Sequence, residues 1–292
     1  MPGRGAAPPS TAAVRPAAVA GRFYPDGAAA AAACDRLFAS TSTSAPLALG
    51  VMCPHAGWMY SGRLAAATLS AVAVPSRVIV VCPNHTGVGP ALALAPPGAW
   101  QLPTGAVSID AELTTSLAAA LAPWGGRVDA GAHRDEHAIE VLVPLLQHRQ
   151  PQLRLTALVV SGGLPAATCA GVGAALADVV RAAGGPARVL LVASSDLNHF
   201  EDQAETERRD ARALAALVGA DPAGLLRVID DADISMCGAR PAAMLLAYAA
   251  ALTRAPQVEI IGHHTSGDVS GDHDRVVGYA GAVVWPDRSQ TP

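Results

Sequence analysis

Two histidines follow Cys-Pro pairs, in a pattern that suits metal ligation. His55 lies in VMCPHAGWMYSG and His85 in VVCPNHTG, each beyond a short apolar run that predicts a buried strand. The runs, 47–53 and 77–82, flank a helical pattern at 61–73, which predicts a βαβ unit with neighbouring parallel strands. Open α/β sheets bind ligands at the carboxyl ends of their strands, so we expect both imidazoles to meet there on a metal ion. A hydrogen-bonded or helix-capping histidine is the alternative at each position.

A third strand end carries two serines, Asp196 and His199 in the stretch RVLLVASSDLNHF. Asp196 also suits the N-cap of a helix, so its presence alone does not indicate a site. Capping does not explain His199, three residues further on. A histidine beside a carboxylate can transfer protons while the carboxylate fixes its tautomer. We therefore predict that His199 and Asp196 are catalytic.

Cys237 precedes a predicted helix start in DADISMCGARPAAM. Because aligned helix amides stabilise a thiolate, the sequence favours Cys237 as the cysteine of lowest pKa. The odd number of cysteines, without paired spacing, indicates reduced thiols rather than a disulfide framework. The other four are predicted to be structural: Cys34, Cys53, Cys82 and Cys169.

The segment HRDEHAIEVLVPLLQ offers a rival metal pattern. His133 and His137 are four residues apart and are expected to share a helical face. In the zincin pattern the catalytic Glu follows the first His, whereas here Arg134 does, which disfavours that class. We instead predict that Glu136, His137 and Glu140 orient metal-bound imidazoles.

Further polar residues lie in GHHTSGDVSGDHDRVVGYAG, after the apolar run 257–262. Ser266, Asp268 and Asp272 have the residue types and glycine neighbours of turn formers. We predict a structural loop, placed over the same edge of the sheet.

The pattern of elements predicts a single α/β domain with a mixed or largely parallel central sheet flanked by helices. Hydrophobic residues make up 51% of the 292-residue chain, enough for a large core. We expect a disordered tail at 1–14, the domain at 15–287 and a C-terminal tail at 288–292. The predicted strands are 47–53, 77–82, 91–95, 153–160, 188–193, 257–262 and 276–285. The predicted helices are 61–73, 110–121, 135–149, 165–183, 202–219, 222–229 and 239–252.

Charge and composition exclude several functions. The net charge is −4 and the chain contains no lysine, which argues against nucleic-acid and membrane-surface binding. It also excludes a phosphate-binding loop of the Gly-Lys-Ser/Thr kind and Schiff-base chemistry. The apolar segment PAAMLLAYAAAL is too short to span a bilayer, and the N-terminus lacks the apolar core of a signal peptide. We expect a cytoplasmic protein.

Seven motifs in this order resemble the Memo family, whose bacterial members are called AmmeMemoRadiSam system protein B. They are RPAAVAGRFYP, CPHAGWMYSG, CPNHTG, DEHAIEVLVPLLQ, VASSDLNHF, MCG and TSGDVSGDHDRVVGYAGAV. The resemblance runs from about Arg15 to Val284. It implies the fold of class III extradiol dioxygenases, which hold non-heme Fe(II) by two histidines and a carboxylate.

The resemblance also implies roles for individual residues. By motif, His55 and His85 are the imidazole ligands, and Cys237 stands where the dioxygenases have their carboxylate. His199 matches the acid/base histidine, with Asp196 beside it. The residues implied to line the substrate pocket are Tyr60, Trp58 and His137. The implied cofactor is Fe(II), and because a thiolate is a softer ligand than a carboxylate, copper or zinc are alternatives.

This chain departs from the family pattern at four positions near the implied pocket. Trp58, Phe200 and His263 stand where the family usually has tyrosine, and Asn198 replaces a serine. Fewer phenols change the proton supply and polarity of the pocket. The resemblance therefore does not carry a substrate over to this chain.

Several functions fit these residues. One is a mononuclear metal enzyme of the extradiol dioxygenase type, and another is an iron or copper protein for redox chemistry or metal homeostasis without ring cleavage. A third is a non-catalytic peptide- or protein-binding module that works with radical-SAM and AMMECR-type proteins. A hydrolase with Cys237 as nucleophile and His199 as base is a fourth.

Overall fold

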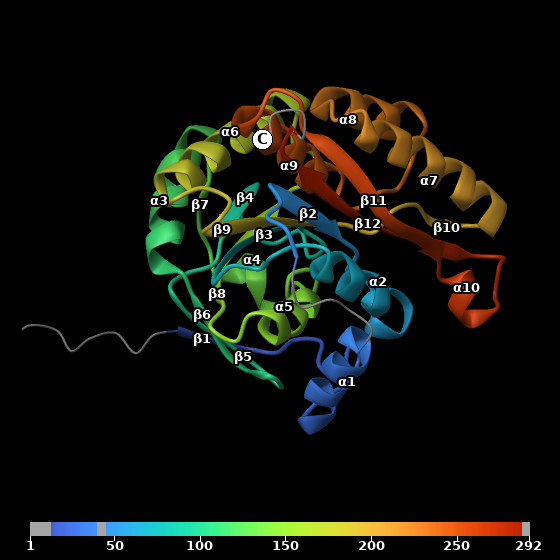
Figure 1. The fold of residues 1–292 in the computed structure, drawn as a ribbon, viewed down its shortest axis with the longest axis horizontal. Helices are drawn as coiled ribbons and strands as arrows, with labels where there is room; N and C mark the ends of the chain where they lie inside the picture. The colour runs from blue at the N-terminus through green and yellow to red at the C-terminus, as the bar shows by residue number, and fades with distance from the viewer. Residues whose placement is uncertain (1–12, 40–44, 288–292) are drawn as a thin grey trace, which may run out of the picture.

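The computed structural model describes residues 13–39 and 45–287. They form one α/β domain with a large mixed sheet between two layers of helices, which confirms the predicted fold class (Figure 1). The predicted tails lie largely outside the described residues, at 1–12 and 288–292. The first strand begins at Ala13, two residues before the predicted start of the domain.

Twelve strands form the sheet in the described part of the chain. The main path is β1-β5-β6-β8-β3-β9-β2-β12-β10, with β11 beside β12, and β4 between β7 and β8. The strands are β1 (Ala13–Pro16), β2 (Gly50–Cys53), β3 (Arg77–Pro83), β4 (Leu92–Leu94), β5 (Gly98–Leu102), β6 (Gly105–Ile109), β7 (Arg127–Val128), β8 (Arg154–Val160), β9 (Val189–Ser194), β10 (His199–Glu201), β11 (Gln257–Thr265) and β12 (Val276–Trp285).

The four central strands β8, β3, β9 and β2 are parallel, so their carboxyl ends lie at one edge of the sheet. β9 lies between β2 and β3 and pairs with both. The prediction that β2 and β3 are neighbours was therefore wrong. β9, which comes more than 100 residues after β3 in the sequence, is inserted between the two strands. The local sequence around β2 and β3 does not reveal this insertion.

Helices cover both faces of the sheet (Figure 1). α3, α6, α7, α8 and α9 pack on one face, and α1, α2 and α5 on the other. The helices are α1 (Ala28–Phe38), α2 (Trp58–Ser70), α3 (Ala111–Leu121), α4 (Gly131–Arg134), α5 (Val143–Arg149), α6 (Ala166–Ala182), α7 (Gln203–Val218), α8 (Pro222–Asp231), α9 (Ala239–Leu252) and α10 (Gly267–Ser270), with short 3₁₀ turns at Ala122–Trp124 and Glu140–Leu142.

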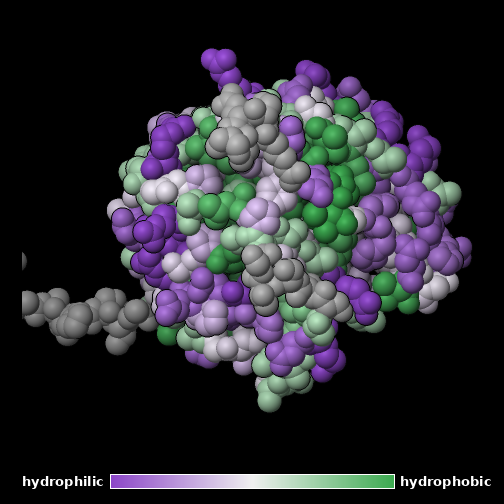
Figure 2. Space-filling model, viewed as in Figure 1, coloured by the Kyte–Doolittle hydropathy of each residue, from purple (hydrophilic) through white to green (hydrophobic). Residues whose placement is uncertain are grey.

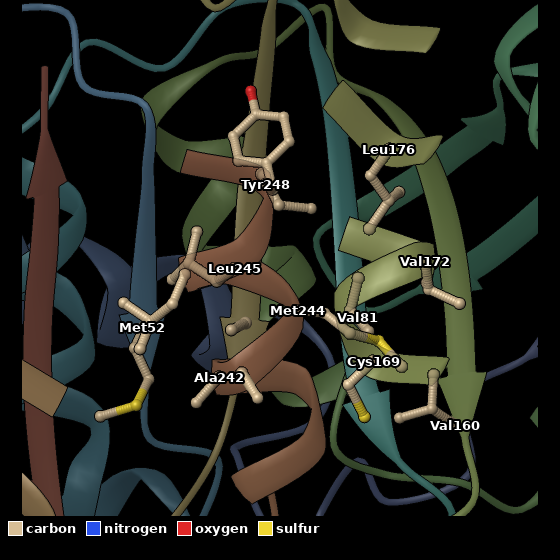
Figure 3. Close-up of a cluster of buried hydrophobic side chains, with 14 of the residues drawn as sticks. Met52, Val81, Val160, Cys169, Val172, Leu176, Ala242, Met244, Leu245 and Tyr248 are labelled. Carbon is tan, nitrogen blue, oxygen red and sulfur yellow. The ribbon is translucent and has the colours of Figure 1, made fainter. Parts of the chain in front are cut away.

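Both faces of the central strands are buried, as expected for parallel strands between helices. In β3, Val78, Val80 and Cys82 face one helical layer while Ile79 and Val81 face the other, following the two-residue period of a strand. Each such side chain contributes roughly 1.5–3 kcal/mol on burial. Figure 3 shows the layer in which α9 and α6 pack on β2, β3 and β8; it labels Met52, Val81, Val160, Cys169, Val172, Leu176, Ala242, Met244, Leu245 and Tyr248.

Aspartates define several helix starts. Asp110 accepts a hydrogen bond from the Leu113 amide at the start of α3, and Asp202 accepts one from the Glu205 amide at the start of α7. Charged residues then cover the outer surface of α7, which is hydrophilic in Figure 2. None of the helices in the described segments combines the length and apolarity that a bilayer crossing requires.

The segment 135–149 is not the single helix that its periodicity predicts. α4 ends at Arg134, an irregular stretch contains Glu136 and His137, and α5 begins at Val143. The Glu136 side chain bonds the backbone amides of His85 and Ala138, which holds this stretch out of helical geometry. His133 and His137 consequently do not share a helical face.

Candidate metal centre

The polar residues at the ends of β2, β9 and β3 meet above the carboxyl edge of the sheet. His55 follows β2, Asp196 follows β9 and His85 follows β3, and the loop before α9 brings Cys237 to the same place. One ligand atom each from His55, His85 and Cys237 lies within 4.8 Å of the others. The sequence thus identified the three residues that converge.

His55 is held inside the protein with a defined tautomer. Its Nδ1 lies 2.8 Å from Ser194 Oγ, and that hydroxyl donates to the carbonyl of Ala138 at 2.7 Å. Because the hydroxyl proton is committed to Ala138, Nδ1–H of His55 donates to Ser194, and Nε2 keeps a free lone pair. Nε2 lies 3.3 Å from Cys237 Sγ. Burial, with His85 and His137 nearby, holds the pKa of His55 well below its ordinary value.

His85 lies at the surface, and a carboxylate orients it. Its Nδ1 lies 2.9 Å from Glu136 Oε1, and its backbone N–H donates to Glu136 Oε2 at 2.7 Å. Glu136 is 1% exposed. Burial alone would raise the pKa of Glu136, but the hydrogen bond from the His85 ring outweighs it and lowers the pKa. A carboxylate behind an imidazole that presents its other nitrogen is the usual support of a metal-bound histidine.

The Cys237 thiol is not the low-pKa thiolate that its place before a helix predicts. Its sulfur accepts a hydrogen bond from the Asp196 amide at 3.3 Å. Burial, and then the charge of Asp196, raise the pKa of Cys237. Desolvation outweighs the amides at the start of α9. A thiol of this kind loses its proton when it coordinates a cation, which favours a ligand over a free nucleophile.

The donor set fits a transition-metal ion. Two imidazoles, each held through Nδ1, present Nε2, and a cysteine sulfur faces them. A second cluster, of His85, Glu136 and His137, also has ligand atoms within 4.8 Å of one another. Both Glu136 oxygens already accept hydrogen bonds from His85 and Ala138, so its geometry is that of an orienting group.

Two further titratable residues border this cluster. The Nδ1–H of His199 donates to the Ser235 carbonyl at 3.0 Å, which leaves Nε2 unprotonated. Asp196 Oδ1 accepts from the His55 amide at 2.7 Å, and Oδ2 lies 3.9 Å from His55 Nε2. Burial raises the pKa of Asp196 to about 7, against the backbone hydrogen bonds, which lower it. Burial lowers the pKa of His199 below its ordinary value, so of the two groups it is Asp196 that has a pKa near neutral pH.

A cavity of about 430 Å³ adjoins the cluster. Tyr60, His137, Asp196 and His199 all line it. Trp58 does not. Its side chain is buried, donates from Nε1 to the Val141 carbonyl at 2.9 Å, and borders a neighbouring groove.

Of the other walls of this cavity, only Phe200 was placed near the pocket by the sequence motifs. They are Arg22, Phe23, Ala56, Gly57, Met59, Phe200, Val277 and Tyr279. Phe200 is exposed at φ 69°, in the left-handed region that few non-glycine residues adopt. The Phe23 ring packs against the His137 ring at a tilt, with centroids 4.7 Å apart, a contact between segments more than 100 residues apart that no local pattern reveals.

The other candidate residues have structural roles. Glu140 lies away from the imidazoles and accepts from Arg15, from the Tyr24 hydroxyl and from the amides of Ala18 and Val19. The remaining four cysteines are buried free thiols, as predicted. Asp268 accepts a hydrogen bond from the Thr265 amide and closes a turn. This agrees with the prediction that the loop after β11 is structural. Neither the Ser266 nor the Asp272 side chain belongs to the cluster.

Comparison with known proteins agrees with the motifs. The family model described as "Memo-like protein" matches residues 15–283. The protein belongs to the Memo family. A MEMO1 family protein of Ignicoccus hospitalis is 36% identical over 295 residues, covering 94% of this chain and 99% of that one. Those of Thermotoga maritima and Methanopyrus kandleri are 38% and 35% identical, covering 81% and 80% of this chain and 83% and 82% of their own.

A solved structure supports the fold of this Memo family member. An uncharacterized Escherichia coli K12 protein superposes with a TM-score of 0.50 at 15% identity. The superposition covers 73% of this chain and 87% of that one. At this identity the likeness extends to the fold alone.

Proposed function

We propose that this Memo family protein binds one transition-metal ion through His55, His85 and Cys237, with Fe(II) as the first choice and copper or zinc as alternatives. The observation that supports this most directly is the orientation of both imidazoles. Ser194 and Glu136 each occupy the Nδ1 of one ring, so both Nε2 lone pairs are available beside the sulfur. A mixed nitrogen and sulfur donor set selects iron, copper or zinc over magnesium or calcium.

The proposed activity is redox or O₂-dependent chemistry on a small molecule in the adjoining cavity. A bound iron or copper ion would supply one-electron chemistry and Lewis acidity. The protein supplies the rest. His199 presents an unprotonated Nε2 to the cavity and can accept a proton, while buried Asp196 can hold one near neutral pH. The cavity of about 430 Å³ lies within the range of small-molecule sites, roughly 300–1,000 Å³.

Metal analysis tests the binding step. Protein prepared without oxygen is expected to carry close to one equivalent of iron or copper, and His55→Ala and Cys237→Ala are expected to lose it. His148→Ala and Cys169→Ala serve as matched controls, because both residues lie outside the cluster. Full metal content in the His55 and Cys237 variants would contradict the site. Oxygen uptake with a panel of catechols then separates catalysis from metal storage. A catalytic protein is expected to consume oxygen above background, whereas a storage protein leaves the uptake at background.

A second candidate function is a binding module for a peptide or protein, with radical-SAM and AMMECR-type proteins as proposed partners. It is favoured by a groove of about 560 Å³ beside the cavity, which shares Arg22, Phe23 and Met59 with it. Arg22, Arg36 and Arg63 line this groove and form no ion pair within residues 13–39 and 45–287. Titration with purified partners tests this function. Binding that Arg36→Glu abolishes and His55→Ala leaves intact would support it over the metal-dependent activity.

A further inference from the structure

A separate cavity of about 300 Å³ lies between β1, β5, β6 and α4. It shares none of its lining residues with the cavity beside the metal cluster. We propose that this second cavity is a binding site for a small aromatic carboxylate that carries a ring N–H or O–H. Three properties of its walls support this chemistry.

The walls are mainly apolar and include one large ring. Trp100 of β5 is almost fully buried, and Ile109, Ala99 and Pro96 extend the apolar lining, with Val14 exposed nearby. The volume is at the lower limit for small-molecule sites, roughly 300 Å³. A single aromatic ring system of indole size suits such a space, because planar rings bury much apolar area in a small volume.

His133, from α4, provides an unpaired hydrogen-bond acceptor. The residue lines the cavity and is 2% exposed. Its Nε2 lies 3.1 Å from the Ala93 carbonyl and therefore donates, while Nδ1 has no hydrogen-bond partner in the described segments. Burial lowers the pKa of His133 to about 4, so the ring is neutral and Nδ1 carries a lone pair. Buried polar atoms are rarely left unpaired. Because Nδ1 is closed to water, a ligand N–H or O–H would satisfy it after the His133 ring turns toward the cavity.

Arg134 provides a free cation beside His133. It lines the cavity, is exposed, and forms no ion pair with any residue in 13–39 or 45–287. Arg15, the other arginine of the lining, is already committed: it stacks 4.2 Å from the Trp100 ring centroid and donates to Glu140 and to the carbonyls of His133 and Glu136. An anionic group on the ligand therefore pairs with Arg134.

Binding of indole-3-acetate, measured by calorimetry on the full chain with and without metal, tests the site. Wild type is expected to bind it and to bind its methyl ester about tenfold more weakly, because the ester loses the charge. Arg134→Gln is expected to weaken the acid about tenfold and leave the ester unchanged. Arg212→Gln, at an exposed arginine of α7 far from the lining, is the control and should bind as wild type.

Two further variants test the location and the hydrogen bond. Ala130→Phe, at an exposed wall position, is expected to fill the cavity and abolish binding while its melting temperature stays that of wild type. N-methylation of the indole is expected to weaken binding to wild type about tenfold but to have no effect in His133→Phe, which lacks the acceptor. No binding to wild type at millimolar ligand, or undiminished binding to Ala130→Phe, would overturn the proposal.

Discussion

The two histidines of the candidate metal centre share a motif but lie in opposite environments. His55 is 1% exposed and is supported by a neutral hydroxyl, whereas His85 is exposed and is supported by the buried carboxylate of Glu136. Burial already restricts the ring of His55, so a weak support is enough. The exposed ring of His85 can adopt more orientations, and a charge-assisted hydrogen bond is strong enough to hold it in one of them. In this pair, the more exposed ring has the charged support and the buried ring the neutral one.

The largest effect on metal affinity among the supporting residues is expected for Glu136→Gln. The amide cannot accept from the His85 ring, the His85 amide and the Ala138 amide together, so one N–H faces another and the ring turns. Loss of such a support typically lowers metal affinity about 10–100-fold. Competition titration with a chromogenic chelator measures it.

Glu140→Gln is the matched control for this substitution. It removes another buried carboxylate, one that contacts the N-terminal segment and neither imidazole. It is expected to lower the melting temperature and to leave metal affinity within about twofold of wild type. Equal losses of metal affinity in Glu136→Gln and Glu140→Gln would show that lower overall stability, and not the orientation of the His85 ring, explains the loss.

A smaller loss, about two- to tenfold in metal affinity, is expected for Ser194→Ala. The surrounding core still restricts His55. The variant leaves the His55 Nδ1–H and the Ala138 carbonyl without their partner, so stability should fall by about 1–3 kcal/mol. Chemical denaturation together with the chelator titration separates the two effects. Ser61→Ala is the control, and a larger affinity loss for Ser194→Ala than for Glu136→Gln would reverse the comparison.

No effect on metal affinity is expected for Asp110→Asn, in which the carboxylate has a purely structural role. Asp110 caps α3 and accepts from Arg77 at 2.7 Å. Although burial would raise its pKa, the Arg77 hydrogen bond lowers it overall. The stability it provides is therefore complete above the unfolded pKa, about 3.9, and is lost as pH falls through the lower folded pKa.

The Asp110→Asn difference in melting temperature should thus be large at pH 7 and shrink below about pH 4. At pH 7 we expect a loss of about 1–3 kcal/mol. A difference that stays constant with pH would mean that the charge of Asp110 contributes nothing.

Some features of this centre are visible in the sequence and others are not. The positions of His55 and His85 after apolar runs were enough to bring them to one edge, because parallel strands end together. The insertion of β9 between β2 and β3 was not predictable, because strand order depends on long-range packing. The pKa of Cys237 was predicted in the wrong direction, since the helix start is local but desolvation is set by the whole fold.

Supporting residues were harder to predict than ligands. Glu136 was recognised as an orienting group from its type and its neighbour His137, although the helix expected around it does not form. Ser235 gave no signal, because its carbonyl and its hydroxyl contact His199 from 36 residues away in the sequence. The hairpin of β5 and β6 also escaped prediction, since its apolar residues alternate with small and polar ones in too short a run.

The hydrogen bonds of Arg15 have a consequence for how the protein is made. They join the N-terminal strand to a stretch 118 to 125 residues later, the one that carries Glu136. Closing so long a loop costs considerable chain entropy, and contacts of this span slow folding. During synthesis on the ribosome, β1 emerges early, but Arg15 cannot form these hydrogen bonds until the later stretch has been synthesised. The proposed metal site is therefore incomplete until the two ends of this loop have met.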